Sequence, residues 1–297
     1  MILQDLEKKQ LIHPPSFLLT NTMYCTLMGS QSYGCAVESS DFDVYGFCIP
    51  HKDMVFPHLA GEVLGFGKQI KRFEQWQESH IIDPSAVGGK GREYDFTVYN
   101  IVKYFQLLMD NNPNIIDSIF TDQTCVLHTT EIGNMVRDSR KIFLHKGAWH
   151  KFRGYSYAQA HKMNLKEATG KRKELVEKYS FDVKFGMHLV RLLNEIEQIL
   201  VKGDLDLQEN NEQLKAIRRG EVAQEDILKW MASKEIQLEK LYHESKLPWG
   251  PDEDKIKALL LQCLEHHYGS LEKAIERPDK YRIALMNVKE ILDSVKI

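Results

Sequence analysis

The fold is decided by one stretch of sequence, residues 22–46, which reads TMYCTLMGSQSYGCAVESSDFDVYG. Residues 22–28 are apolar and rich in β-forming side chains, which predicts a short buried strand. Gly29-Ser30 ends that strand, because glycine and serine are typical turn residues. Residues 41–49 begin with alternating polar and apolar side chains, which predicts a second strand. The stretch therefore predicts two strands joined by a loop that starts at a Gly-Ser turn.

Two carboxylates open the second of these strands. Successive side chains in a strand point to opposite faces, so Asp41 and Asp43 should share one face while Phe42 and Val44 enter the core. Neighbouring carboxylates repel each other unless a cation lies between them, and Mg²⁺ prefers such oxygen ligands. We therefore predict that Asp41 and Asp43 bind Mg²⁺, with Mn²⁺ as the alternative ion. An Asp-x-Asp pair by itself also occurs at solvated strand edges and turns.

The Gly-Ser turn offers groups that could bind phosphate, which the carboxylate pair by itself cannot do. Glycine lets a phosphate approach the backbone, and the Ser30 hydroxyl with nearby amides can hold phosphate oxygens. Gly29 and Ser30 are thus predicted to bind a nucleotide beside the metal ligands Asp41 and Asp43. Nucleotidyl transfer needs this combination, because paired metal ions activate the attacking hydroxyl and neutralise the leaving pyrophosphate.

A third carboxylate would complete such a site. Glu93 and Asp95 share a face of the following predicted strand. We favour Asp95 as a catalytic residue and metal ligand that could also accept the proton of the nucleophile, with Glu93 as its rival. The alternative is that Asp95 only caps the helix that follows, since aspartate is a favoured N-cap residue.

The rest of the chain divides into two parts. Further strands are predicted at 75–83 and 94–98, joined by a turn at 88–91, and a helix at 99–109. From about Thr130 helical periodicity dominates. It predicts helices at 130–140, 148–168, 172–202, 211–219, 223–244, 253–267 and 280–295. The expected fold is α+β, with an N-terminal α/β domain containing a mixed sheet (1–143) and an all-α C-terminal domain (144–297).

Composition fits an ordinary globular enzyme. The chain has 297 residues, 43% hydrophobic and 27% charged, with a formal net charge of −3. Its first residues predict a short amphipathic helix and not a signal peptide, and its apolar runs are too short to cross a membrane. The five cysteines form no CxxC pair, so we expect neither a disulfide scaffold nor a cysteine zinc site, and we predict a cytoplasmic location. The sequence does not indicate an oligomeric state.

Residues 27–30, 33–34 and 40–46 together resemble the signature of the DNA polymerase β-like nucleotidyltransferase superfamily. The chain is most similar to the RNA-repair-associated branch predicted in bacteria and large tailed phages. Further segments carry that likeness: 95–100, 103–105, 112–114, 152–155 with Gln159 and Lys162, Lys184 with His188 and Arg191, 217–221, and 247–248. Asp117 stands where the branch often has glutamate. The resemblance implies a metal-dependent fold that uses nucleoside triphosphates, and it leaves the acceptor open.

The helical half offers candidate nucleotide ligands. Helical spacing places Tyr155, Gln159 and Lys162 on one face, and Lys184, His188 and Arg191 on the polar stripe of a helix whose buried side includes Phe185. Tyr155 could stack on a base, the cations could contact phosphates, and His188 could bind ribose or phosphate. The alternative is a set of solvated helical faces. The stretch 151–191 is basic, with ten Lys or Arg against four Asp or Glu.

These observations predict an Mg²⁺-dependent nucleotidyltransferase that moves a nucleoside monophosphate from a triphosphate to a hydroxyl and releases pyrophosphate. An RNA end is the favoured acceptor, followed by a protein side chain and then a small molecule. A non-catalytic nucleotide- or nucleic-acid-binding module is a second class of function, and a structural protein is a third. The expected partners are a nucleoside triphosphate and RNA, with no membrane.

Overall fold

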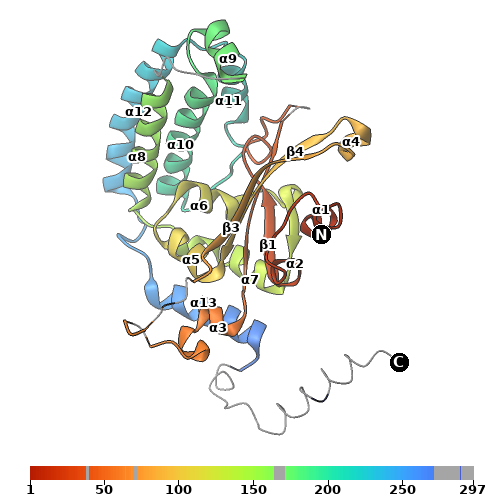
Figure 1. Cartoon of the computed structure of the whole chain (residues 1–297). Coiled ribbons are helices and arrows are strands. Elements are labelled where there is room, and N and C mark those ends of the chain that lie inside the picture. The colour runs from red at the N-terminus through yellow and green to blue at the C-terminus, as the bar shows by residue number, and fades with distance from the viewer. Residues whose placement is uncertain are drawn as a thin grey trace.

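A mixed β-sheet forms the centre of the N-terminal half (Figure 1). In this computed structural model the described residues are 1–270 and Val288, apart from 38–39, 64, 68, 70–71 and 164–170. Within them the sheet has the order β3-β4-β2-β1-β5. Its strands are β1 (Thr22–Leu27), β2 (Phe42–Cys48), β3 (Gln75–Asp83), β4 (Arg92–Asn100) and β5 (Val126–Thr129). The pair β2 and β4 is parallel and the other pairs are antiparallel, so the predicted α+β class with a mixed sheet is confirmed.

Helices surround the sheet and then continue alone. The N-terminal half contains α1 (Ile2–Lys8), α2 (Leu18–Asn21), α3 (Lys52–Val55), α4 (Ala86–Gly89), α5 (Ile101–Met109), α6 (Pro113–Phe120) and α7 (Glu131–Asp138). The later helices are α8 (Ala148–Met163), α9 (Lys171–Tyr179), α10 (Val183–Lys202), α11 (Asn211–Arg218), α12 (Gln224–Glu244) and α13 (Glu253–Tyr268). Short 3-10 turns occur at Pro57–Ala60, Gln123–Cys125 and Arg140–Phe143.

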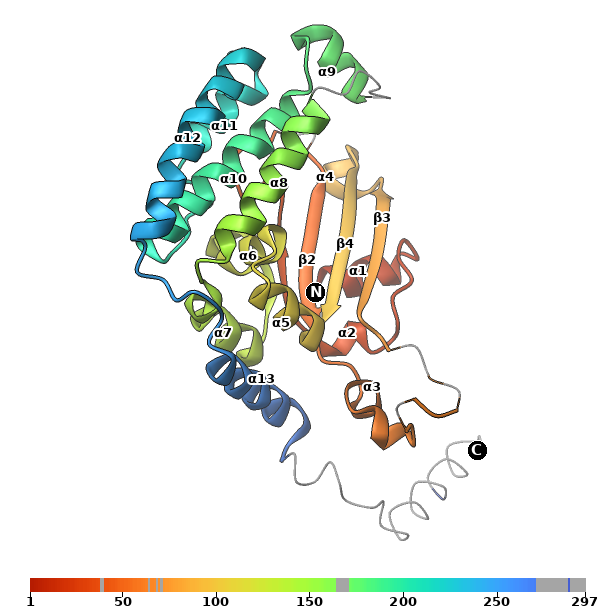
Figure 2. The ribbon, with the colours of Figure 1, turned by 90° about the vertical axis from the view of Figure 1, so that its left-hand side faces the viewer.

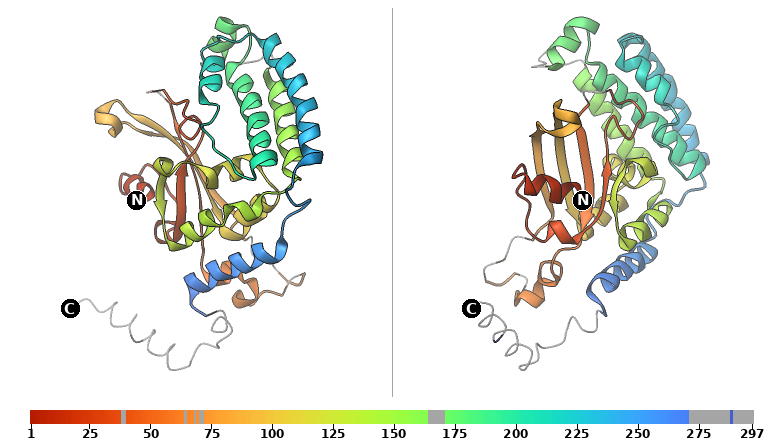
Figure 3. Two further views of the ribbon diagram at one scale, coloured as in Figure 1. Left: turned by 180° about the vertical axis from the view of Figure 1, so that it is seen from behind. Right: turned by 90° about the vertical axis from the view of Figure 1, so that its right-hand side faces the viewer.

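The two faces of the sheet are covered differently. On one face α1 and α2 contribute Leu3, Leu6 and Leu18 to a core with Trp76 and Phe96 (Figure 3). On the other face α5, α6 and α7 pack over the β1–β2 side of the sheet. Figure 2 shows that the edge strand β3 and most of its neighbour β4 extend beyond these helices. Alternation along β2 fits this arrangement, since Val44 is fully buried.

The helical half stands beside the sheet (Figure 1). The helices α8, α11 and α12 pack around α10, which is buried along most of its length. The chain then returns, because α13 packs on α5 and α7 and its Tyr268 hydroxyl donates a hydrogen bond to the carbonyl of Pro50. The division at residues 143/144 stays a prediction. No helix among the described residues has the length and apolar character needed to cross a lipid bilayer.

Several predicted boundaries are wrong. The single helix expected at 172–202 is two helices, because Ser180 adopts a left-handed φ of 68° and Asp182 caps α10. The helix α6 and the strand β5 are not predicted at all. The predicted helix 280–295 and the end of the one at 148–168 lie outside the described residues.

Candidate active site

The Gly-Ser turn leaves β1 and curls back against β2. The Met28 amide donates to the Asp43 carbonyl at 2.7 Å, and the Cys35 amide donates to the Ser30 carbonyl at 2.9 Å. Gly29 has a φ of 62°, which favours glycine. A Cβ atom at this position would lie 2.2 Å from Oδ2 of Asp43. The turn is therefore pressed against the carboxylate, and only glycine allows that approach.

Replacing Gly29 with alanine should damage this site. The methyl group meets both an unfavourable φ and the Asp43 carboxylate, so we expect a loss of about 1–3 kcal/mol of folding free energy. Nucleotide transfer should fall by about a hundredfold, because the displaced carboxylate leaves its working position. Gly61→Ala is the matched control, since Gly61 has a φ of 79° with nothing within 4 Å of its Cβ position. Equal losses in both variants, measured by thermal unfolding and transfer rate, would contradict the contact with Asp43.

Three carboxylates gather at the end of the parallel strand pair. Asp43 and Asp95 are directly opposite each other in the β2–β4 register, and Asp41 lies one position before β2. Burial raises the pKa of Asp43 to about 6, with further contributions from Asp95 and then Asp41, while Lys184 acts in the opposite direction. Burial and the charges of Asp95 and Asp41 thus disfavour the ionised form of Asp43. A cation bound between the carboxylates would relieve their repulsion.

Hydrogen bonding separates Asp95 from Glu93. A β-bulge in β3 places His80 beside both residues, with φ 59°. The His80 amide donates to Oδ1 of Asp95 at 2.7 Å, and its ring nitrogen Nδ1 lies 2.7 Å from Oε1 of Glu93. Asp95 therefore faces Asp43 with a fixed orientation, whereas Glu93 is engaged by the His80 ring. Bulges cluster at functional sites, but no sequence pattern marked His80 in advance.

The alternative role for Asp95 as a helix cap is wrong. The helix α5 starts only at Ile101, and its N-cap is Asn100, whose side chain accepts from the Val102 amide at 3.0 Å. Asp95 lies inside β4, on the strand itself. The Asp95 carboxylate therefore does not cap α5.

A cavity of about 380 Å³ lies beside Asp43. Its walls come from the Gly-Ser turn, β2, α6, α8 and α10. It brings together seven residues that the sequence singled out, namely Gly29, Asp43, Tyr155, Gln159, Lys162, His188 and Arg191. The helices α8 and α10, which follow the sheet in sequence, thus face the Gly-Ser turn across one space large enough for a nucleotide.

Not every predicted residue lines this cavity. Ser30 and Lys184 are outside its lining, although Lys184 is near enough to lower the pKa of Asp43. Phe185 was expected on the buried side of its helix and instead lines the cavity, with the Lys162 ammonium 5.8 Å from the centre of its ring. Asn114 of α6 also lines the cavity and was not predicted. An aromatic ring and an amide at a cavity wall suit a base better than a phosphate.

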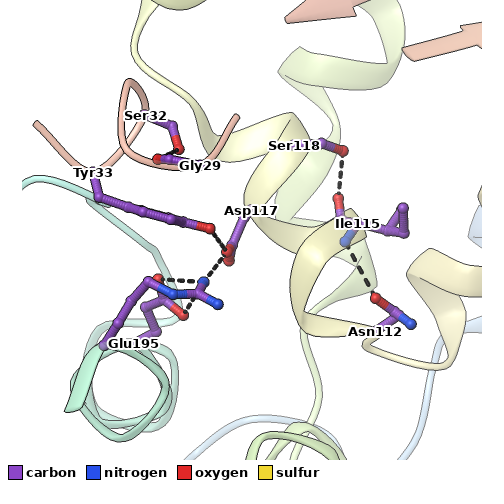
Figure 4. Close-up of polar contacts among 9 residues, drawn as sticks. Gly29, Ser32, Tyr33, Asn112, Ile115, Asp117, Ser118 and Glu195 are labelled. Carbon is purple, nitrogen blue, oxygen red and sulfur yellow. Dashed lines mark hydrogen bonds and ion pairs between the residues drawn. The ribbon is translucent and has the colours of Figure 1, made fainter. Parts of the chain in front are cut away.

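Arg191 lies in surroundings different from those predicted. The sequence placed it on a polar helical stripe, but its side chain is only 4% exposed. Its Nη1 donates to Asp117 and, at 3.1 Å, to both carboxylate oxygens of Glu195. The Tyr33 hydroxyl donates to Asp117 at 2.9 Å, and the guanidinium lies 4.4 Å from the centre of the Tyr33 ring. Figure 4 shows the side chains of Tyr33, Asp117 and Glu195 converging from the loop after β1, α6 and α10.

This buried cluster of Tyr33, Asp117, Arg191 and Glu195 has one guanidinium for two carboxyl groups. Burial raises the pKa of both Asp117 and Glu195, for Glu195 well above its usual value, while Arg191 acts in the opposite direction. Among the described residues, Arg191 Nε and Asp117 Oδ1 have no hydrogen-bond partner. The guanidinium is thus held by protein carboxyls, which argues against the phosphate contact expected for Arg191.

Comparison with known families agrees with this geometry. The model of the RNA repair pathway DNA polymerase beta family, RlaP, matches residues 2–262. The chain belongs to the RlaP family. The match runs from α1 through most of α13, so it includes the sheet, the carboxylates and the helical half. A search of curated proteins found no significant match.

Nucleotidyltransferases of the superfamily to which RlaP belongs generally use a divalent metal and a nucleoside triphosphate. In this RlaP chain Asp41, Asp43 and Asp95 offer only carboxylate oxygens, which are the ligands that a hard cation prefers. Across the described residues, no group of three or more His, Cys, Asp or Glu side chains is arranged so that it could hold a metal ion by itself. Mg²⁺ is usually held by one or two carboxylates together with substrate phosphates, so an incomplete cage fits an ion that arrives with a nucleotide.

Proposed function

We propose that the protein is a divalent-metal-dependent nucleotidyltransferase that moves a nucleoside monophosphate from a triphosphate to a hydroxyl, with an RNA end as the favoured acceptor. One observation carries the proposal: Asp43 lies opposite Asp95 in the β2–β4 register while the Gly29 turn presses against it. Phosphate-binding backbone and two carboxylates then meet at one point. The family description, which names an RNA repair pathway, supports RNA as the acceptor.

The nucleotide occupies the cavity between the Gly-Ser turn and the helical half. Gly29 leaves room for a phosphate at the backbone, and Ser30 extends the same turn. From α8 and α10, Lys162 and His188 line the cavity, where they would bind phosphate or ribose oxygens. Lys184 acts on the same region through its charge. We accordingly assign residues 144–297 to binding of the nucleotide and of part of the acceptor, and residues 1–143 to catalysis.

The base has its own part of the cavity. Tyr155 and Phe185 offer aromatic rings for stacking, and Asn114 and Gln159 offer amide groups. The Tyr155 hydroxyl accepts from Asn112 Nδ2 at 3.0 Å, which fixes the ring that would meet the base. A base held there leaves the triphosphate pointing toward Gly29 and Asp43.

The reaction requires one bond to form and one to break. The acceptor oxygen attacks the α-phosphorus, and the bond from that phosphorus to the oxygen bridging the β-phosphorus breaks, so that pyrophosphate leaves. The Asp95 carboxylate, oriented by the His80 amide, accepts the hydroxyl proton. Asp41, Asp43 and Asp95 would hold Mg²⁺ or Mn²⁺, which supplies charge neutralisation and a more acidic acceptor hydroxyl.

Removing the charge of Lys162 should weaken nucleotide binding. Lys162→Met keeps the length of the side chain but loses a cation at the cavity wall, so we expect the dissociation constant for a nucleoside triphosphate to rise by about tenfold. Titration calorimetry with a non-hydrolysable triphosphate measures this. Lys151→Met is the control, because Lys151 lies on the same helix but pairs with Asp110 outside this cavity. Equal affinity in both variants would remove Lys162 from the binding site.

The whole proposal is tested by transfer of label. The purified protein is incubated with Mg²⁺ and α-labelled triphosphates, and RNA ends, total protein and small alcohols are offered as acceptors. Label in the RNA fraction is the expected result. Label in protein or small alcohols would preserve the chemistry and replace the acceptor. No labelled acceptor and no metal-dependent triphosphate binding would overturn the proposal.

A further inference from the structure

The sheet continues beyond Asp95 through β4 to the edge strand β3. On β4, Thr97 and Tyr99 follow Asp95 on the same face, because alternate residues of a strand share a face. The neighbouring strand β3 pairs Gln77 with Thr97 and Gln75 with Tyr99. Gln75 and Gln77 are exposed, whereas Thr97 is only 8% exposed and the partly buried Tyr99 ring lies 6.3 Å from the ring of Tyr104 on α5. We call the four residues Gln75, Gln77, Thr97 and Tyr99 the β3–β4 platform.

The platform is polar and aromatic. Gln75 and Gln77 are exposed and touch each other, with Nε2 of the first 3.5 Å from Oε1 of the second. The Tyr99 ring is partly exposed and lies 6.5 Å from the ring of Tyr45, which lines the nucleotide cavity. An aromatic path therefore leads from the cavity to the platform. Amides that form hydrogen bonds and rings that stack suit unpaired bases better than an apolar protein surface.

Strand order gives the direction from which an acceptor arrives. Gly29 follows β1, Asp43 lies on β2, Asp95 on β4, and β3 forms the edge. A triphosphate held at Gly29 lies on the β1 side of Asp43. The hydroxyl that loses its proton to Asp95 must then come from the opposite side, which is the side of the platform.

We propose that the β3–β4 platform binds the last unpaired nucleotides of an RNA acceptor, with Tyr99 stacking on a base. This inference rests on the proposed function and adds to it the acceptor site and the single-stranded form of the acceptor. Tyr99 lies four residues beyond Asp95, roughly 13 Å along the strand. That length corresponds to about three or four stacked nucleotides from the reacting hydroxyl.

The test measures RNA binding without nucleotide or metal. Fluorescence anisotropy follows the full-length protein and a labelled oligoadenylate of about ten nucleotides, a length within the range of single-strand sites. The single strand should bind more tightly than a blunt duplex of the same sequence. Tyr99→Leu should weaken binding of the single strand about tenfold, whereas Tyr99→Phe should keep it, because phenylalanine still stacks. Tyr157→Leu is the control, since Tyr157 is a partly exposed tyrosine that bonds Glu235 on α12.

Substitutions at Gln77 test the platform at a position outside the hydrophobic core. Gln77 is exposed, so Gln77→Glu and Gln77→Lys leave the fold intact and change only the charge offered to the RNA. The first should weaken binding and the second should strengthen it. Unchanged affinity in Tyr99→Leu and in both Gln77 variants would overturn the inference, as would a preference for the blunt duplex. RNA binding with these effects but no transfer would support the platform while the proposed chemistry failed, and transfer to protein without RNA binding would do the reverse.

Discussion

Asp43→Asn should reduce nucleotide transfer by about a thousandfold or more while the protein stays folded. Asparagine keeps the shape of the side chain but loses the negative charge that faces Asp95 and Asp41. Metal-based charge stabilisation supplies several kcal/mol to such a reaction, and each 1.4 kcal/mol corresponds to a tenfold change in rate. Single-turnover transfer with α-labelled triphosphate measures the loss.

The stability of this variant gives a second readout. Burial and the neighbouring carboxylates disfavour the charged form of Asp43, so the neutral side chain should raise, or at least maintain, the thermal stability of the metal-free protein. Asp110→Asn is the control, because Asp110 is exposed and pairs with Lys151 away from the three carboxylates. A variant that stays folded and keeps a tenth of the transfer rate would make Asp43 structural and not catalytic.

Arg191→Met should be the most destabilising single change in the buried cluster, costing about 3–5 kcal/mol. It leaves Asp117 and Glu195, which are 0% and 3% exposed, without their shared cation. For a chain of this size that cost corresponds to a fall of about 10 °C in melting temperature. Differential scanning calorimetry or circular dichroism would record it. If Arg191 binds phosphate, as the sequence predicts, the main effect of the substitution will instead be on nucleotide affinity.

Two control variants test whether the loss of stability in Arg191→Met comes from the buried charges of the cluster. Arg153→Met removes an arginine that pairs with Glu235 and whose side chain is 41% exposed. Exposed ion pairs of this kind contribute about 1 kcal/mol or less to stability. The triple variant Arg191→Met, Asp117→Asn, Glu195→Gln removes both carboxylate charges with the cation and should recover much of the lost stability. An Arg191→Met protein that melts no earlier than Arg153→Met would show that the cluster does not hold the turn, α6 and α10 together.

The sequence predicted the strands that have a clear apolar or alternating pattern and missed the elements without one. Strand β1 was found from its apolar, β-forming residues, all of which are buried, and β2 from the alternation at its start. The helix α6 was missed because seven of its eight residues are buried, including Asp117 and Ser118, so its polar residues mark no solvent face. The strand β5 has only four residues, all half-buried. The break before α10 depends on the left-handed Ser180, which no local pattern requires.

The candidate site was predictable where its geometry is local. Asp43 and the Gly-Ser turn come from adjacent strands, and helical spacing grouped Tyr155 with Lys162 correctly along one wall of the cavity. The surroundings of Arg191 were not predictable, because its partners Asp117 and Tyr33 come from distant parts of the chain. His80 was not predicted for a related reason, because its position depends on a bulge that forms only when β3 pairs with β4.

The parallel pairing of β2 with β4 also affects how the protein folds. Parallel strands cannot be joined by a tight turn, and here the connection contains α3 and the whole of β3. Asp43 and Asp95 therefore meet only after a long loop has closed, which is a slow and non-local event. During synthesis this carboxylate pair cannot assemble until β4 has left the ribosome. We expect partly folded chains to have the Gly-Ser hairpin but no active centre.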